Sequence, residues 1–208
     1  MQKIVFCSIT MKKKTDLEKS VYKVNGNSTI NFELPVFYPI NGVLSKILAK
    51  NDKIKVVMLK KEDSAKNCDK NVEVFKQELN SINEKIGAKI EYKELSIPLD
   101  ETRKTQETLL QEMINELSEK SEIYADITFS VKSLPIITFC VLNYAEKFME
   151  ADIKSIVYGQ AEFDDENKPH NHTLFDMTAL FYLNSITNKI ECKNGEQAKK
   201  ILNKLLLR

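Results

Sequence analysis

The sequence lacks the residues that build the common nucleotide-binding loops and catalytic triads. It has no tryptophan, five glycines and two histidines in 208 residues. The glycines form neither a G-x-G-x-x-G after the first predicted strand nor a G-x-x-x-x-G-K-[ST] anywhere, so the usual signatures of NAD and ATP binding are absent. With only His170 and His172 available, no Ser–His–Asp or Cys–His arrangement can be recognised.

Clustered cysteines and long apolar runs are also missing. Cys7, Cys68, Cys140 and Cys192 are far apart and form no C-x-x-C pair. A zinc site or a disulfide framework needs closer spacing or a secreted context, so we expect buried free thiols in a reducing cytosol. The opening run M-Q-K-I-V-F-C-S-I-T is too short for a membrane span and has the wrong polarity for a signal peptide. We therefore expect a cytoplasmic protein without membrane contact.

No charge of one sign dominates. Lys and Arg total 31 against 30 acidic residues, which gives a net charge of +1. Bulk charge therefore offers no argument for binding duplex nucleic acid, and any phosphate site must be local. Hydrophobic residues make up 42% and charged residues 29%, a balance typical of a soluble domain.

Short β-branched runs alternate with amphipathic helical patterns, which predicts an α/β fold with a doubly wound, mainly parallel sheet and helices on both faces. We expect residues Ile4 to Phe6, Val56 to Met58 and Ile127 in its central strands. The expected strands are Lys3–Ser8, Ile54–Leu59, Lys89–Ile97, Tyr124–Phe129 and Ile153–Tyr158. The expected helices are Pro39–Ala49, Val72–Ile86 (ended by Gly87), Asp100–Lys120 and Leu134–Met149.

Two further features break the alternation. Two alternating runs between Val21 and Leu34 flank Asn25-Gly26-Asn27, which predicts a β-hairpin insertion. After Gly159 a polar, turn-rich stretch predicts a terminal hairpin, followed by a helix from Ala179 to about Thr187 and an amphipathic helix from Gly195 to Leu207. We expect residues 1–190 to form one domain and residues 191–208 to add the last helix.

Two strand ends carry groups suited to an anion. Ligands of open parallel sheets bind beyond the carboxyl ends of the strands. The first predicted strand runs into the hydroxyls and lysines of Ser8–Lys14, and another runs into Asp126–Pro135, directly before a helix. The candidate donors of the second segment are Thr128, Ser130, Lys132 and Ser133. A helix N-terminus with free N–H groups and a nearby lysine favours phosphate. Alternatively, Ser133 only caps the helix and Lys132 is solvated.

The two histidines do not predict a metal site. They form H-N-H near Asp164, Asp165 and Glu166. A metal site needs a third ligand fixed by a rigid element, so we expect a solvated loop and no metal.

The segment D-I-T-F-S-V-K-S-L-P at 126–135 resembles the D-x-T-x-G-x-[RK]-S-L-P segment of CRISPR-associated Rossmann-fold (CARF) proteins of the Csx/Csm effector group. S-I-V-Y-G-Q-A-E-F at 155–163 resembles that group's strand with a tyrosine–glycine pair, and T-L-F-D-M-T-A-L-F-Y-L at 173–183 resembles its D-[LM]-T helix start. The likeness runs from Met1 to about Asn188 and implies a Rossmann-like sensor domain.

The resemblance implies a cyclic oligoadenylate as ligand, most often the tetramer, which type III CRISPR complexes make as a second messenger in antiviral defence. No cofactor is implied. The residues that the resemblance places at the ligand are Ser8, Ile9, Thr10, Lys12, Thr128, Ser130, Lys132, Ser133 and Gln160. Ser130 stands where family members often have glycine, which leaves the ring size open.

Two functions follow from the same residues. One is a sensor without chemistry of its own, and the other is a metal-independent ring nuclease in which the ribose 2′-hydroxyl attacks its own phosphate. Candidate catalytic residues for the second are Lys132, Ser8 and Ser130, with Thr10 as a further hydroxyl. An α/β domain with a purely structural role is a third possibility. Such sensors usually carry an effector, so the protein either acts alone or is a segment of a longer chain.

The symmetry of the ligand predicts a homodimer. A cyclic tetra-adenylate has a two-fold axis, and a C2 dimer offers the same loops twice. The apolar helix Leu134–Met149, with Ile136, Phe139 and Tyr144, could supply part of the contact, although burial within its own subunit is the simpler explanation of its apolar residues.

Overall fold

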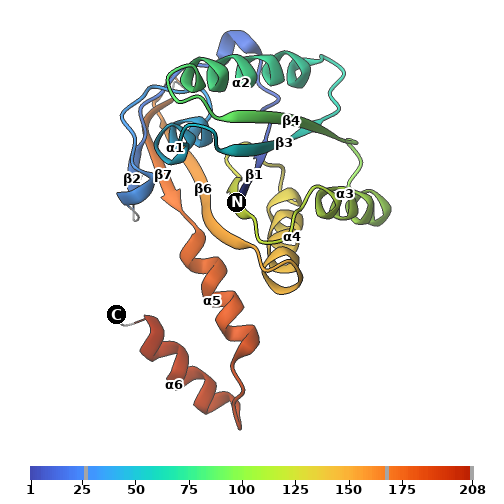
Figure 1. Ribbon diagram of the computed structural model, residues 1–208, viewed down its shortest axis with the longest axis vertical. Coiled ribbons are helices and arrows are strands. Elements are labelled where there is room, and N and C mark those ends of the chain that lie inside the picture. Colours follow the sequence, from blue (N-terminus) through green and yellow to red (C-terminus); the bar gives the residue numbers. More distant parts are fainter. Residues whose placement is uncertain (26–27, 167–168, 207–208) are drawn as a thin grey trace.

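The computed structural model describes residues 1–25, 28–166 and 169–206 and contains one sheet with helices on both faces (Figure 1). The strands are β1 (Gln2–Ser8), β2 (Lys23–Asn25), β3 (Lys53–Lys61), β4 (Lys89–Ile97), β5 (Glu122–Asp126), β6 (Asp152–Phe163) and β7 (Pro169–Asp176). Among the described residues they form a seven-stranded sheet in the order β2-β7-β6-β5-β1-β3-β4. All neighbours are parallel except β6 and β7. The predicted fold class is confirmed.

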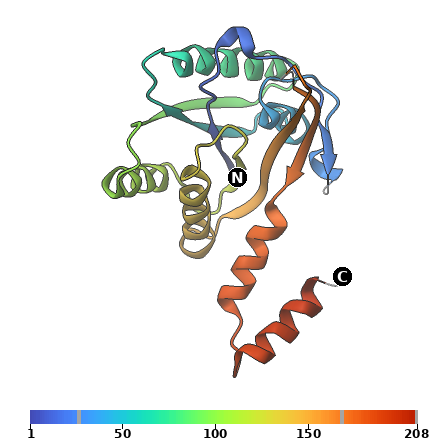
Figure 2. The ribbon, with the colours of Figure 1, turned by 180° about the vertical axis from the view of Figure 1, so that it is seen from behind.

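Helices cover the sheet on both sides. The helices are α1 (Pro39–Ile47), α2 (Asn67–Asn83), α3 (Arg103–Asn115), α4 (Leu134–Phe148), α5 (Thr178–Lys189) and α6 (Gly195–Leu206), with short 3₁₀ helices η1 (Lys14–Asp16) and η2 (Ser28–Ile30). In both views α1 and α2 lie on one face of the sheet, and α3 and α4 lie on the other (Figures 1 and 2).

The apolar run of β1 explains why two layers of helices are needed. Successive side chains of a strand point to opposite faces. Val5 and Cys7 accordingly belong to the core under α1 and α2, whereas Ile4 and Phe6 belong to the core under α3 and α4. All four side chains are buried. A strand that is apolar at every position can be buried only between two layers.

Several predicted boundaries move by a few residues. β5 ends at Asp126, and the next residues form a turn, so Ile127 is half-buried beyond the strand instead of central in it. The helix expected from Asp100 begins at Arg103, because the Thr102 hydroxyl accepts the Thr105 N–H at 3.3 Å and caps it. Gly87 lies in the left-handed region (φ +82°), but α2 already ends at Asn83.

The predicted hairpin between Val21 and Leu34 is wrong. β2 pairs in parallel with β7, and the second expected strand is replaced by η2 and irregular chain. The turn residues 26–27 lie outside the described residues. Burial explains the difference, since Ile30 and Phe32 are 3% and 2% exposed and pack into the core. The Phe32 ring can pack against α1 because residue 42 is glycine: a Cβ atom at this position would lie 2.2 Å from the ring.

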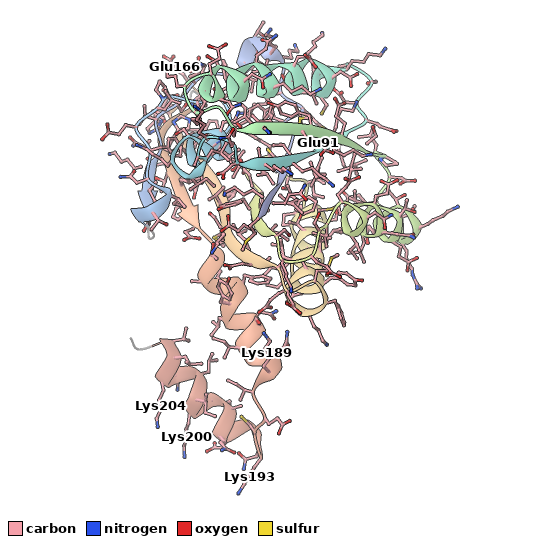
Figure 3. All side chains as sticks on the ribbon, viewed as in Figure 1. Glu91, Glu166, Lys189, Lys193, Lys200 and Lys204 are labelled. Carbon is pink, nitrogen blue, oxygen red and sulfur yellow. The ribbon has the colours of Figure 1, made fainter. Side chains whose placement is uncertain are left out.

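The C-terminal part follows the sequence prediction more closely. β6 and β7 form the expected antiparallel hairpin, in which Tyr158 faces Phe175. α5 then leads away from the sheet, and α6 turns back at an angle to α5 without reaching the sheet (Figures 1 and 2). None of the residues of α6 is buried. Lys193, Lys200 and Lys204 point away from the sheet (Figure 3).

Candidate functional site

The carboxyl ends of β1, β5 and β6 meet at one edge of the sheet. β5 lies between the other two strands, and both pairings are parallel. The loops that follow β1 and β5 are therefore neighbours. The Oγ atoms of Ser8 and Ser130 lie 2.8 Å apart and form a hydrogen bond. The structure thus brings together the two segments that the sequence singled out.

The loop after β1 is held by α2. The Asn71 side-chain amide donates to the carbonyls of Thr10 and Lys12 at 2.7 and 2.8 Å. The Ile9 N–H donates to the Leu59 carbonyl at 2.9 Å. Ser8, Ile9 and Thr10 are buried, and Lys12 is exposed. Ile9 and Thr10 therefore support the loop from within, whereas Lys12 is available at its surface.

The loop after β5 is organised by Asp126. This buried carboxylate accepts the Thr128 N–H at 2.8 Å and the Ile40 N–H, at the start of α1, at 3.3 Å. The Thr128 hydroxyl accepts the Gly159 N–H at 2.8 Å, which ties the loop to β6. Burial raises the pKa of Asp126 to about 6. Asp126 thus positions the loop and lies beneath its surface.

The start of α4 differs from the sequence expectation in two ways. Ser133 stands at the N-cap position, but its hydroxyl makes no capping hydrogen bond within the described chain. The backbone N–H groups expected to be free are partly used: Leu134 donates to Val131, and Ile136 and Ile137 both donate to the Ser133 carbonyl. Pro135 has no N–H to offer. Anion binding here would depend on side chains, with Lys132 exposed and Ser133 half-buried.

An open cleft of about 280 Å³ lies beside the two loops. Its lining includes three predicted residues: Lys12, Thr128 and Gln160. The Ser8–Ser130 pair, Lys132 and Ser133 are outside this lining. The predicted residues therefore divide into a group in the cleft and a group on the adjoining loops.

The aromatic walls of the cleft were missed by sequence reasoning. They are formed by Tyr22, Phe37, Phe129, Tyr158 and Phe163, with the ring of His172. The Tyr22 and His172 rings are edge to face at 5.3 Å, and the His172 Nε2 lies 3.1 Å from the Ser20 Oγ. The only available signal was the tyrosine–glycine pair at Tyr158. Tyr22 and His172 are far apart in sequence and meet because β2 pairs with β7.

The two histidines do not form a solvated loop as expected. Both belong to β7. His172 is half-buried, and burial, assisted by the charge of Lys12, lowers its pKa below the usual value. His170 is 3.6 Å from a carboxylate oxygen of Glu162. Across the three described ranges, no group of three or more His, Cys, Asp and Glu side chains could hold a metal ion.

Opposite charges meet in the site. Asp16, Glu18 and Lys12 all line the cleft, and Lys132 is exposed on the neighbouring loop after β5. A carboxylate disfavours a phosphate beside it, whereas hydroxyls and lysines favour one. The edge of the sheet therefore offers an aromatic cleft of mixed charge next to a rim that carries Ser130, Lys132 and Ser133.

Comparison with known proteins gives one distant similarity. No family model matches the sequence. Over 101 residues, 49% of the chain, the sequence is 29% identical to a CRISPR-associated protein of Methanocaldococcus jannaschii. The match covers 16% of that protein's length, so the chain corresponds to a small part of it. In the part of the chain that the structure describes, no helix is long and apolar enough to cross a membrane. The structure thus has a Rossmann-like α/β fold, and about half of the chain is similar to a part of a CRISPR-associated protein.

Proposed function

We propose that this protein is a CRISPR ancillary sensor that binds a cyclic oligoadenylate at the edge formed by β1, β5 and β6. The observation that carries the proposal is the 2.8 Å contact between Ser8 and Ser130, which joins the two hydroxyl- and lysine-bearing loops beside an aromatic cleft. A cyclic oligoadenylate needs both environments, because it has charged phosphodiesters and flat bases.

The phosphodiesters would lie on the rim of the site. Lys12 and Lys132 are exposed on the two loops, and Ser133 makes no capping bond within the described chain that would occupy its hydroxyl. Charge-assisted hydrogen bonds from lysine to phosphate are among the stronger polar contacts. Since the whole chain has a net charge of only +1, affinity would come from this local group.

The outward face of α4 supports a homodimer. Ile136 is 67% exposed and Phe148 is 62% exposed, and Cys140 and Tyr144 are exposed between them at helical spacing of four residues. Phe139 instead packs on Phe181 at 5.3 Å within the subunit. An apolar stripe of this kind on the solvent side of a helix marks an interaction surface. A C2 dimer through α4 would present each loop twice to one ring.

The ring nuclease is the second candidate function. Its support is the hydrogen bond between the Ser8 and Ser130 hydroxyls, which brings two candidate catalytic groups together on the loops that also carry Lys12 and Lys132. In that reaction the ribose 2′-oxygen bonds to phosphorus while the 5′-oxygen leaves with a proton, so no metal is required.

Titration calorimetry with cyclic tetra-adenylate tests the proposal. We expect one ring per two chains, and Lys132→Ala should weaken binding about ten- to a hundredfold, the range for a lost charge-assisted contact. Lys89→Ala, an exposed lysine at the first residue of β4 and therefore at the opposite edge of the sheet, serves as the matched control and should bind normally. No heat of binding with the wild-type protein would reject the proposal. Chromatography of the same mixtures separates the two candidates, because only a ring nuclease yields linear products.

A further inference from the structure

A groove runs along α2, on the face of the sheet that α1 and α2 cover. It consists of two adjoining open hollows of about 270 and 540 Å³, whose linings share Lys19, Glu78 and Ser81. The first hollow lies between α2 and the segment 14–19, and the second lies between α2, α1 and the segment 33–35. The groove is therefore elongated in the direction of the helix, and not a compact pocket.

The groove has an accessible apolar lining. Leu34 is 40% exposed, Pro35 is exposed, and the other apolar residues near the surface are half-buried because they cover the core beneath α1 and α2. These half-buried residues are Leu17, Phe37, Ile82 and Ile86. An apolar surface that folding leaves accessible in a concave site is typical of a binding groove.

The wall opposite α2 is fixed by Glu78. The Glu78 side chain is only 4% exposed, and its carboxylate accepts the N–H of Phe37 at 2.8 Å and that of Tyr38 at 3.2 Å. The Asn41 amide donates to the same carboxylate at 3.0 Å. These bonds hold the chain before α1 against α2. The groove is therefore formed before anything binds, which lowers the entropic cost of binding.

Lysines surround the apolar lining. Lys14, Lys46 and Lys85 make no ion pair with another described residue, and Lys19 lies 3.9 Å from Glu78 and over the Phe37 ring. The carboxylates in the lining are the exposed Glu33 and Glu78, and Glu78 is already occupied. The accessible charge of the groove is thus mainly positive, although the whole chain is nearly neutral.

This combination fits an acidic, amphipathic segment of another protein. Apolar side chains of such a segment would fill the lining, and its carboxylates would meet the lysines. Single-stranded RNA fits less well, because bases stack on aromatic rings and Phe37 is the one aromatic residue among the described lining residues. A membrane surface also fits less well, since an apolar face must protrude to enter lipid and this one is recessed.

We propose that the groove along α2 is a docking site for an acidic amphipathic segment of a partner protein. This interaction goes beyond the proposed function and does not require a cyclic oligoadenylate. Leu17 and Phe37 line both the groove and the cleft of the candidate site. A partner in the groove would therefore contact two side chains that are shared with that site.

The experiment selects short random peptides displayed on phage for binding to the immobilised full chain. We expect the selected peptides to be enriched in Asp and Glu and in Leu, Ile and Phe. Calorimetry then measures the synthetic peptide that binds best. The double variant Lys46→Glu, Lys85→Glu should weaken this peptide by about tenfold or more, because two attractions become repulsions.

Matched variants separate the groove from general charge effects. Lys104→Glu, Lys200→Glu changes the net charge by the same amount at exposed positions on α3 and α6, and it should bind the peptide like the wild type. Leu34→Ala should weaken the peptide about threefold or more through lost apolar contact. Leu180→Ala, which trims an exposed leucine of α5, should have no effect.

Three results would overturn the docking site. One is a selection that yields no peptides, or peptides without acidic enrichment. Another is equal binding to the wild type and to Lys46→Glu, Lys85→Glu when circular dichroism shows that the variant is folded. The third is loss, in this variant, of binding to oligouridylate or to vesicles of equal parts phosphatidylcholine and phosphatidylserine while no acidic peptide binds. None of these results bears on titration with cyclic tetra-adenylate, so the two proposals fail separately.

Discussion

Two regions of the molecule are held in place in opposite ways: the C-terminal helix α6, and the edge of the sheet where the candidate site lies. The edge is fixed by buried polar groups: Asp126 and Asn71 bond to the loops that they support. α6 has an apolar seam through Ile201, Leu202 and Leu205, but none of its residues is buried. Hydrogen bonds to fixed backbone groups specify the position of a loop, whereas an amphipathic pattern only specifies that a helix forms.

The difference teaches where substitutions should matter. Removing one partner of a buried hydrogen bond leaves the other unsatisfied, which costs more than the bond itself contributes. Trimming an exposed apolar side chain removes little that folding had buried. Stability should therefore depend strongly on the polar anchors of the edge and weakly on α6.

Between these two regions, the largest effect is expected for Asp126→Ala. The N–H groups of Thr128 and Ile40 would lose their acceptor in a buried setting, at a cost of about 2–4 kcal/mol in the free energy of unfolding. Urea denaturation at pH 7 measures it. Glu91→Gln, an exposed carboxylate on β4, should leave the midpoint unchanged. Equal midpoints for the two variants would show that Asp126 does not anchor the edge.

The pH dependence of stability sharpens the same point. Burial raises the pKa of Asp126 from 3.8 to about 6, so between these values the folded state keeps a proton that the unfolded chain releases. The contribution of this residue is therefore greatest below about pH 4 and declines as the pH rises to 6. The Asp126→Asn variant cannot ionise at this position. Relative to it, the unfolding free energy of the wild type should fall by on the order of 2 kcal/mol between pH 4 and 7. If the difference in unfolding free energy between the two proteins stays constant from pH 4 to 7, the pKa of Asp126 is not raised by burial.

A smaller effect is expected for Asn71→Ala. The carbonyls of Thr10 and Lys12 would lose a donor from α2, which costs about 1–2 kcal/mol in unfolding free energy. Because this amide holds the loop that carries Lys12, affinity for cyclic tetra-adenylate should also fall, by less than Lys132→Ala causes. Calorimetry and urea denaturation of one preparation provide both numbers. Unchanged stability would mean that α2 does not hold this loop.

The smallest effect is expected in α6. Leu206→Ala trims a side chain that is 59% exposed, so the unfolding free energy should change by no more than about 0.5 kcal/mol. Leu142→Ala in α4, where the side chain is 1% exposed, should cost about 2–5 kcal/mol and serves as the internal reference. If Leu206→Ala lowers the unfolding free energy as much as Leu142→Ala does, then α6 is packed in solution. The two regions would then not differ in how firmly they are held.

The order of apolar and polar residues was enough to predict the elements whose burial depends on residues close together in the sequence. The continuous apolar run of β1 predicted a strand covered on both faces, and both layers are present. The strand-to-helix segment Asp126–Pro135 predicted a loop at the edge of the sheet, and the structure places it there. The same reasoning failed between Val21 and Leu34. There the alternation that predicts a hairpin strand was produced by Ile30 and Phe32, which insert into the core against α1.

The sequence by itself determined the α/β alternation, the parallel core and the two segments that supply hydroxyls and lysines. Only the tertiary structure decided which residues meet. Ser8 contacts Ser130, and Tyr22 contacts His172, because β1 lies beside β5 and β2 lies beside β7. Strand order is set by long-range pairing and by the burial of whole faces, which no local window of residues encodes. The aromatic cleft is a product of that order, so it could not be predicted from any one segment of the chain.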